Sequence, residues 1–144
     1  LRPMMGNRIY GCDDCQLVCP WNRFADVTSE EDFHPRQVLH GQSLNALFSW
    51  SEEAFLRNTE GSPIRRIGFE KWQRNIAVAL GNAPYSEESI LLLKERRGCV
   101  SDLVDRHIDW ALEQQQEKQQ ATDVKNRQQA RLIRVIEKGL PRDA

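Results

Sequence analysis

The chain has 144 residues, of which 40% are hydrophobic and 28% charged, and its formal net charge is −1. This composition is typical of a helix-rich globular protein, and the near-zero charge excludes a global field that would attract nucleic acid or a membrane surface. No apolar run approaches the ~18 residues of a membrane-spanning helix, and no secretory signal is visible. We therefore expect a cytoplasmic protein without a membrane partner, whose four cysteines are reduced or bound to metal.

The first 24 residues carry the strongest chemical signal. Cys12, Cys15 and Cys19 follow the spacing C-x2-C-x3-C, and Pro20 comes directly after the last cysteine. Bacterial ferredoxins bind [4Fe–4S] clusters through the longer run C-x2-C-x2-C-x3-C-P, and Ile9 stands where its first cysteine would be. In two-cluster ferredoxins the last cysteine of the run ligates the other cluster. We therefore predict that Cys12 and Cys15 serve one [4Fe–4S] cluster and Cys19 a neighbouring one.

Zinc is the open alternative at this motif, because thiolates suit both zinc and iron–sulfur clusters. A zinc site often combines a C-x2-C pair with two histidines, and His34 and His40 lie within reach in the sequence. The Cys-Pro ending favours an iron–sulfur site. Asp13 is a candidate neighbour of a cofactor, with a solvated turn as the alternative. Cys99 lies far along the chain between two predicted helices, and we expect a packed thiol there.

The segment 25–60 is predicted to be a connector with short helices. One of them spans 43–50, and Ser51 is a good N-cap for the next, because Glu52 and Glu53 follow in the first turn.

The segment 61–144 is predicted to be a helical domain. Apolar residues recur at steps of three and four over 69–80, and the sequence GNAP at 81–84 is a helix stop signal. Ser86 is expected to cap the next helix. The tight turns resemble HEAT-type helical pairs, so the predicted fold class is mostly α: a partial ferredoxin-type [4Fe–4S] loop segment over 1–24, followed by a HEAT-like helical repeat domain.

Two further helices are predicted in this domain. The first runs from Ser101 to about Gln120, with a polar distal part that projects into solvent. The last begins near Asp123, carries a basic face and ends at Gly139 and Pro141.

Four stretches carry a family resemblance: GNRIYGCDDCQLVCPWNRFA at 6–25, DFHPR at 32–36, SPIRRIGFEKWQRNIAVALGNAP at 62–84 and VIEKGLPRDA at 135–144. Together they resemble the C-terminal part of the epoxyqueuosine reductases. The resemblance implies reduction of epoxyqueuosine to queuosine in the wobble position of tRNA, with a cobalamin and two [4Fe–4S] clusters. It also implies a catalytic N-terminal domain and a C-terminal HEAT-like domain.

The resemblance further implies that Cys12 and Cys15 ligate the cluster nearer the cobalamin and that Cys19 ligates the second cluster. The remaining cluster cysteines, the cobalamin-binding domain and the catalytic acid would lie upstream. We therefore expect the chain to be part of a longer oxidoreductase, inactive alone, with the N-terminal domain, a reductant and tRNA as partners.

Two basic stretches are candidates for contact with the phosphates of tRNA, with solvated charged helix faces as the alternative. They consist of Arg65, Arg66, Lys71 and Arg74 near the start of the helical domain and of Arg127, Arg131, Arg134 and Lys138 on the last helix. By contrast, Asn75 and Asn82 are expected to cap or pair helices, and Trp72 and Trp110 to lie in the core.

Two other functions stay open at this point. One is a ferredoxin-like electron-transfer module fused to a helical interaction domain, and the other is a zinc-stabilised helical adaptor without enzymatic activity.

Overall fold

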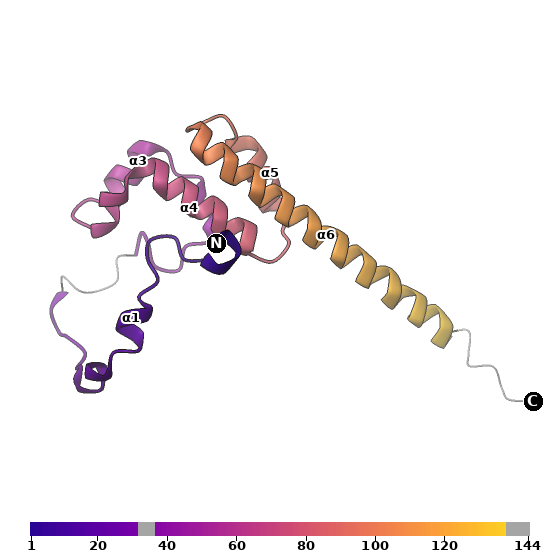
Figure 1. Cartoon of the computed structure of the whole chain (residues 1–144), viewed down its shortest axis with the longest axis horizontal. Coiled ribbons are helices and arrows are strands. Elements are labelled where there is room, and N and C mark those ends of the chain that lie inside the picture. The colour runs from indigo at the N-terminus through magenta and orange to yellow at the C-terminus, as the bar shows by residue number, and fades with distance from the viewer. Residues whose placement is uncertain (32–36, 138–144) are drawn as a thin grey trace, which may run out of the picture.

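The computed structural model describes residues 1–31 and 37–137, with side chains in the last helix described to residue 134 (Figure 1). Within these ranges every regular element is helical and no strand occurs, which confirms a mostly α fold. The 3-10 helices are η1 (Arg2–Met5), η2 (Pro20–Phe24) and η4 (Pro63–Ile67). The α-helices are α1 (Asp14–Leu17), α2 (Leu44–Phe48), α3 (Glu52–Asn58), α4 (Gly68–Asn82), α5 (Glu87–Arg96) and α6 (Asp102–Glu137).

Serine caps define the starts of three helices. Ser43, Ser51 and Ser86 precede α2, α3 and α5, and each hydroxyl accepts a hydrogen bond from the backbone N–H three residues later, at 3.1, 3.2 and 3.3 Å. Each bond satisfies a donor that has no partner within the first helical turn. The predicted caps at Ser51 and Ser86 are confirmed.

The core forms around α4. Trp72, Ile76 and Leu80 recur on one side of this helix at four-residue steps and are at most 2% exposed. They pack with buried side chains of α2, α3, α5 and α6. The core members outside α4 are Leu47, Phe48, Phe55, Leu93, Val104, Ile108 and Ala111. Full burial of each large apolar side chain contributes about 1.5–3 kcal/mol, so these contacts dominate the stability of the helical unit, residues 43–118.

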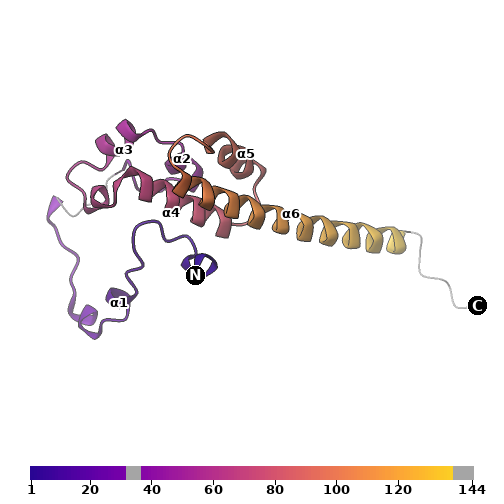
Figure 2. The same ribbon diagram turned by 45° about the horizontal axis from the view of Figure 1, so that its top comes forward.

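The helices α4 and α6 lie side by side in both ribbon views (Figures 1 and 2). Gly81 permits their close approach. A Cβ added there would lie 2.6 Å from Cζ3 of Trp110 and 2.9 Å from Cα of Ala111. Trp110 itself is half-buried and packs against the core from its edge.

Two side chains of α6 hold the end of α4. The fully buried Gln115 donates to the carbonyl of Leu80 at 2.7 Å and accepts from the backbone N–H of Ser86 at 3.1 Å. Lys118 donates to the carbonyls of Gly81 and Ala83 at 2.6 and 2.7 Å. Partial burial lowers the pKa of Lys118. These bonds satisfy carbonyls that a helix C-terminus otherwise leaves unpaired.

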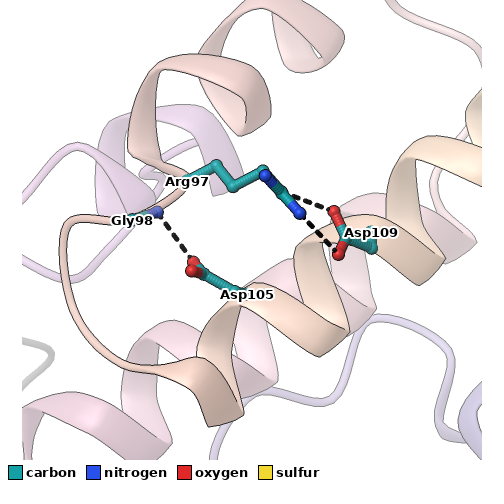
Figure 3. Close-up of polar contacts among 4 residues, drawn as sticks. All are labelled: Arg97, Gly98, Asp105 and Asp109. Atoms are coloured by element: carbon teal, nitrogen blue, oxygen red, sulfur yellow. Dashed lines mark hydrogen bonds and ion pairs between the residues drawn. The ribbon is translucent and has the colours of Figure 1, made fainter.

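The turn between α5 and α6 is closed by two aspartates of α6 (Figure 3). Arg97 donates to both carboxylate oxygens of Asp109, at 2.7 and 3.1 Å, and the backbone N–H of Gly98 donates to Asp105 at 2.8 Å. Pairing raises the pKa of Arg97 and lowers that of Asp109. Gly98 has a φ of 80°, a left-handed conformation that favours glycine.

The predicted break between two C-terminal helices is wrong, because α6 runs without interruption from Asp102 to Glu137. No glycine or proline lies in this stretch. Thr122 does not cap a new helix: its hydroxyl donates back to the carbonyl of Lys118 at 2.8 Å, four residues earlier. The end of α6 therefore extends away from the other helices (Figure 2).

The prediction of a packed thiol at Cys99 is also wrong. Cys99 is exposed in the turn between α5 and α6, where its Sγ lies 3.5 Å from the carbonyl oxygen of Glu95. The turn is closed by polar contacts on the surface and leaves the thiol outside the core.

Candidate metal-ligating segment

The three clustered cysteines lie in a part of the chain that has no buried residue. We call residues 1–9 the anchor segment and residues 10–31 the cysteine segment. Every residue in both is exposed or half-buried. Cys12 and Cys15 are exposed and Cys19 is half-buried. The thiols are therefore open to the outside rather than enclosed by this chain.

Two short helices space the cysteines. Cys12 precedes α1, Cys15 lies within it, and Cys19 is the N-cap of η2. The backbone N–H of Cys19 donates to the carbonyl of Gln16 at 3.1 Å, and the amide of Asn22 donates to the same carbonyl. Pro20 is the first residue of η2. Proline suits this position because it has no N–H that would be left unpaired there and because its φ is restricted to helical values. These bonds link α1 to η2 and place Cys19 beyond the first pair.

The donors fit an iron–sulfur cluster in type but not in number. Thiolates are the usual ligands of such clusters, and a [4Fe–4S] cluster takes four. Within the described ranges, no group of three or more His, Cys, Asp or Glu side chains is arranged to hold a metal ion. His34, one of the two histidines of the zinc alternative, lies outside the described residues, and His40 is exposed.

Asp13 makes the turn between the first two cysteines. It is the only non-glycine residue with a positive φ in the described part of the chain, at 50°, and its side chain makes no capping bond to α1. Aspartate tolerates this left-handed conformation better than most residues. The carboxylate of the next residue, Asp14, pairs with Arg8 at 2.9 Å.

The cysteine segment also exposes large apolar side chains. Leu17, Val18, Trp21, Phe24 and Val27 are between 61% and 100% exposed. The rings of Trp21 and Phe24 contact each other with centroids 5.7 Å apart. Contiguous apolar surface is typical of interaction sites, and the contact between Trp21 and Phe24 joins two of these side chains.

The anchor segment is bound by two asparagines of α4. Asn75 donates to the carbonyl of Ile9 at 2.8 Å, and Asn82 donates to the carbonyls of Arg2 and Gly6 at 2.9 and 3.0 Å. The sequence suggested only a capping or helix-pairing role for these residues. Their spacing of seven residues, which puts them on one face of the helix, was the available signal.

The first basic stretch lies around the start of α4. Arg65 and Arg66 in η4 and Lys71 on α4 are exposed. Arg74 is half-buried, and its guanidinium donates to the side-chain oxygen of Asn75 at 3.1 and 2.9 Å. Arg74 is therefore engaged within the protein, whereas the other three cations are accessible.

The second basic stretch lies on the projecting part of α6. Arg127, Arg131 and Arg134 are exposed, and Lys138 lies outside the described residues. Figure 1 shows the start of α4 and the end of α6 on opposite sides of the molecule, so the two stretches do not form one patch.

These features define a helical protein whose N-terminal segment carries an incomplete ferredoxin-type run of cysteines. Comparison with known proteins finds curated relatives that are similar over nearly the whole chain. The chain is 61% identical to the epoxyqueuosine reductase of Yersinia pestis over 99% of its length, and 60% identical to that of Escherichia coli (strain K12) over its whole length. It is 61% identical to the epoxyqueuosine reductase of Vibrio cholerae serotype O1 over 99% of its length.

The chain is thus a relative of the epoxyqueuosine reductases from end to end. It spans 35%, 38% and 37% of the length of these three curated relatives. No family model matches the chain, and no solved structure matches it. Within the described ranges, none of the helices combines the length and apolar character needed to cross a membrane.

Proposed function

We propose that the chain is the C-terminal part of an epoxyqueuosine reductase, the oxidoreductase that reduces epoxyqueuosine to queuosine in the wobble position of tRNA. The observation that carries this proposal is identity of about 60% to named reductases over nearly the whole chain, including the cysteine segment. The cobalamin and the catalytic acid would belong to the N-terminal domain, which acts together with a reductant.

In this proposal the cysteine segment supplies part of the ligation of two [4Fe–4S] clusters. Cys12 and Cys15 would hold the cluster nearer the cobalamin, and Cys19 would hold the second. Such clusters supply one-electron transfer when bound. The exposed apolar side chains around Trp21 support this role, because they offer a surface that the N-terminal domain can cover so that water is kept from the thiolates.

The helical unit would contact tRNA as a HEAT-like domain. The accessible cations are Arg65, Arg66, Lys71, Arg127, Arg131 and Arg134. On α6 the last three follow steps of four and three residues, so they share one face and can follow a row of phosphates. We omit Arg74 from the contact surface, because its guanidinium is bound to Asn75.

The cluster assignment is tested in the anaerobically purified full-length protein. Iron and sulfide are expected, and zinc without iron would contradict the proposal. Cys12→Ala and Cys15→Ala should abolish the same electron paramagnetic resonance signal, whereas Cys19→Ala should leave that signal in place. Cys99→Ala is the matched control because it removes an exposed thiol outside the motif. Identical losses from all three motif variants would rule out the split assignment.

The RNA surface is tested by reversing two charges on α6. The double variant Arg131→Glu, Arg134→Glu should bind tRNA more weakly. The slope of its logarithmic affinity against logarithmic salt concentration should fall by about 0.7–0.9 for each phosphate that the helix no longer neutralises. Arg57→Glu makes one such charge reversal at an exposed position on α3 and should bind like the parent. Equal affinities of the double variant and the parent would exclude α6 from the RNA surface.

A further inference from the structure

The proposed site raises the question of what places the cysteine segment on the helical unit. Within the described ranges, three side-chain hydrogen bonds join the anchor segment to α4, and all come from Asn75 and Asn82. These asparagines are half-buried and lie two turns apart on one face of α4. Their partners are backbone carbonyls of Arg2, Gly6 and Ile9, spread along the whole anchor segment.

The orientation of each amide follows from its partners. Arg74 can only donate, so the side-chain oxygen of Asn75 must face its guanidinium, and the amide nitrogen must face Ile9. Asn82 approaches two carbonyls, which only an NH2 group can satisfy. Both side chains therefore act as donors held in one orientation rather than as adaptable surface amides.

A contact with α6 secures the start of the anchor segment. The guanidinium of Arg2 lies over the ring of Trp110, 5.6 Å from its centroid, and Trp110 packs where α6 meets Gly81. The anchor is thus also in contact with the place where α4 and α6 meet. The helices leave no room for a Cβ at Gly81, because such an atom would lie 2.6 Å from Cζ3 of Trp110.

The anchor is also close to the first cysteine. Ile9 is bound to Asn75, and Cys12 follows three residues later, a distance that an extended chain spans in about 10 Å at most. Cys12 and Asn75 line the same cavity of about 490 Å³, together with Met5, Arg8 and Tyr10. A displacement of the anchor would therefore move Cys12.

We propose that Asn75 and Asn82 are positioning residues that dock the anchor segment on α4 and thereby fix where the Cys12 thiolate lies relative to the helical unit. The docking follows from the contacts themselves, and its effect on a cluster rests on the function proposed above. Arg74 takes part by orienting Asn75, which gives this cation a role different from phosphate binding.

Hydrogen exchange in the full-length protein tests the docking. Asn75→Asp keeps the size of the side chain and an oxygen facing Arg74, but removes the donor to Ile9. Asn82→Ala removes both donors to the start of the anchor. Amides of residues 4–12 should exchange at least about fivefold faster in each variant, as the loss of one or two hydrogen bonds predicts. Asn126→Ala is the control, because Asn126 is an exposed asparagine on the projecting part of α6.

Electron paramagnetic resonance of the same proteins tests the effect on Cys12. The spectrum of the cluster assigned to Cys12 should change in Asn75→Asp and Asn82→Ala and stay unchanged in Asn126→Ala. Unchanged exchange in residues 4–12 would overturn the docking. Faster exchange with an unchanged spectrum would overturn the positioning, since the anchor would then dock without placing Cys12. A parent protein without iron and sulfide would overturn the proposed function instead, while the exchange data would still decide the docking.

Discussion

The helical unit and the N-terminal 31 residues use the same kinds of side chain in opposite ways. Trp72 in α4 is 1% exposed and lies among other rings, with its centroid 5.8 Å from that of Trp50, whereas Trp21 in η2 is 74% exposed. The helical unit holds its own core, and the N-terminal residues include no buried side chain. The difference shows that the helical unit is stabilised by its own packing, whereas the N-terminal residues have no core of their own.

The contrast matters because ordering a chain segment costs conformational entropy, which buried apolar surface normally offsets. Ordering each residue costs roughly 1–2 kcal/mol, and the helical unit offsets that cost by apolar burial. The cysteine segment has no such burial in this chain. In the proposed function its order would come from the anchor on α4, from bound metal and from a surface that covers its apolar side chains.

The largest expected effect comes from the matched tryptophans. Trp72→Ala should lower the free energy of unfolding by about 3–5 kcal/mol, because it leaves a large cavity in the core. Trp21→Ala should change it by no more than about 0.5 kcal/mol, as is usual for exposed positions. Chemical denaturation of the chain measures both, and a comparable loss from Trp21→Ala would show that the cysteine segment packs on itself after all.

A smaller effect is expected from matched glycines. Gly81→Ala should cost about 1–3 kcal/mol, since the new Cβ would meet Trp110 and the backbone of Ala111 and force α4 and α6 apart. Gly11→Ala introduces a methyl group with no heavy atom within 4 Å and should not destabilise the fold. Denaturation midpoints measure the stability of both variants. An unchanged midpoint for Gly81→Ala would mean that α4 and α6 can move apart at little energetic cost.

The smallest effect concerns pH. Burial lowers the pKa of His107 below its ordinary value of 6.5, and the charges of Arg2, Arg74 and Arg106 lower it further, against a hydrogen bond to the Leu103 carbonyl that raises it. The unfolded chain therefore binds a proton near pH 6.5 that the folded chain does not. Stability contributed by neutral His107 is present above pH 6.5 and decreases as the pH falls towards the lower folded-state pKa.

The variant His107→Gln removes this titration. Its free energy of unfolding should depend less steeply on pH below 6.5 than that of the parent. Because Arg2 belongs to the anchor segment, Arg2→Gln should also reduce the steepness, which connects the two regions in one measurement. If the free energy of unfolding depended on pH in the same way in the parent, His107→Gln and Arg2→Gln, neither the titration of His107 nor the influence of Arg2 on it would be supported.

Local signals made much of the helical unit predictable. Ser51 and Ser86 cap helices as expected, α4 ends at the predicted stop, and Trp72 lies in the core. The end of α6 was not predictable in this way. Thr122 and Asp123 resemble a cap, but a cap requires the chain to turn, and among the described residues no glycine, proline or packing partner makes it turn there.

The candidate site also has features that the sequence predicts and features that it does not. The cysteine spacing is visible in the sequence because ligands of one cluster lie close together along the chain. The bonds from Asn75 and Asn82 join residues 66 to 80 positions apart, so no local pattern contains them. Arg74 likewise resembles any surface cation until Asn75 is seen beside it.

The projecting part of α6 has a consequence for spectroscopy. At 1.5 Å per residue, the 36 residues of α6 extend about 54 Å in total, and the side chains of residues 119–134 are all exposed. A single helix of that kind loses ellipticity gradually on heating, whereas the packed unit unfolds cooperatively. Ellipticity at about 222 nm, the helical minimum, would then show a sloping baseline from the projecting stretch before the main transition. The near-ultraviolet signal of the stacked Trp50 and Trp72 would report the packed unit alone.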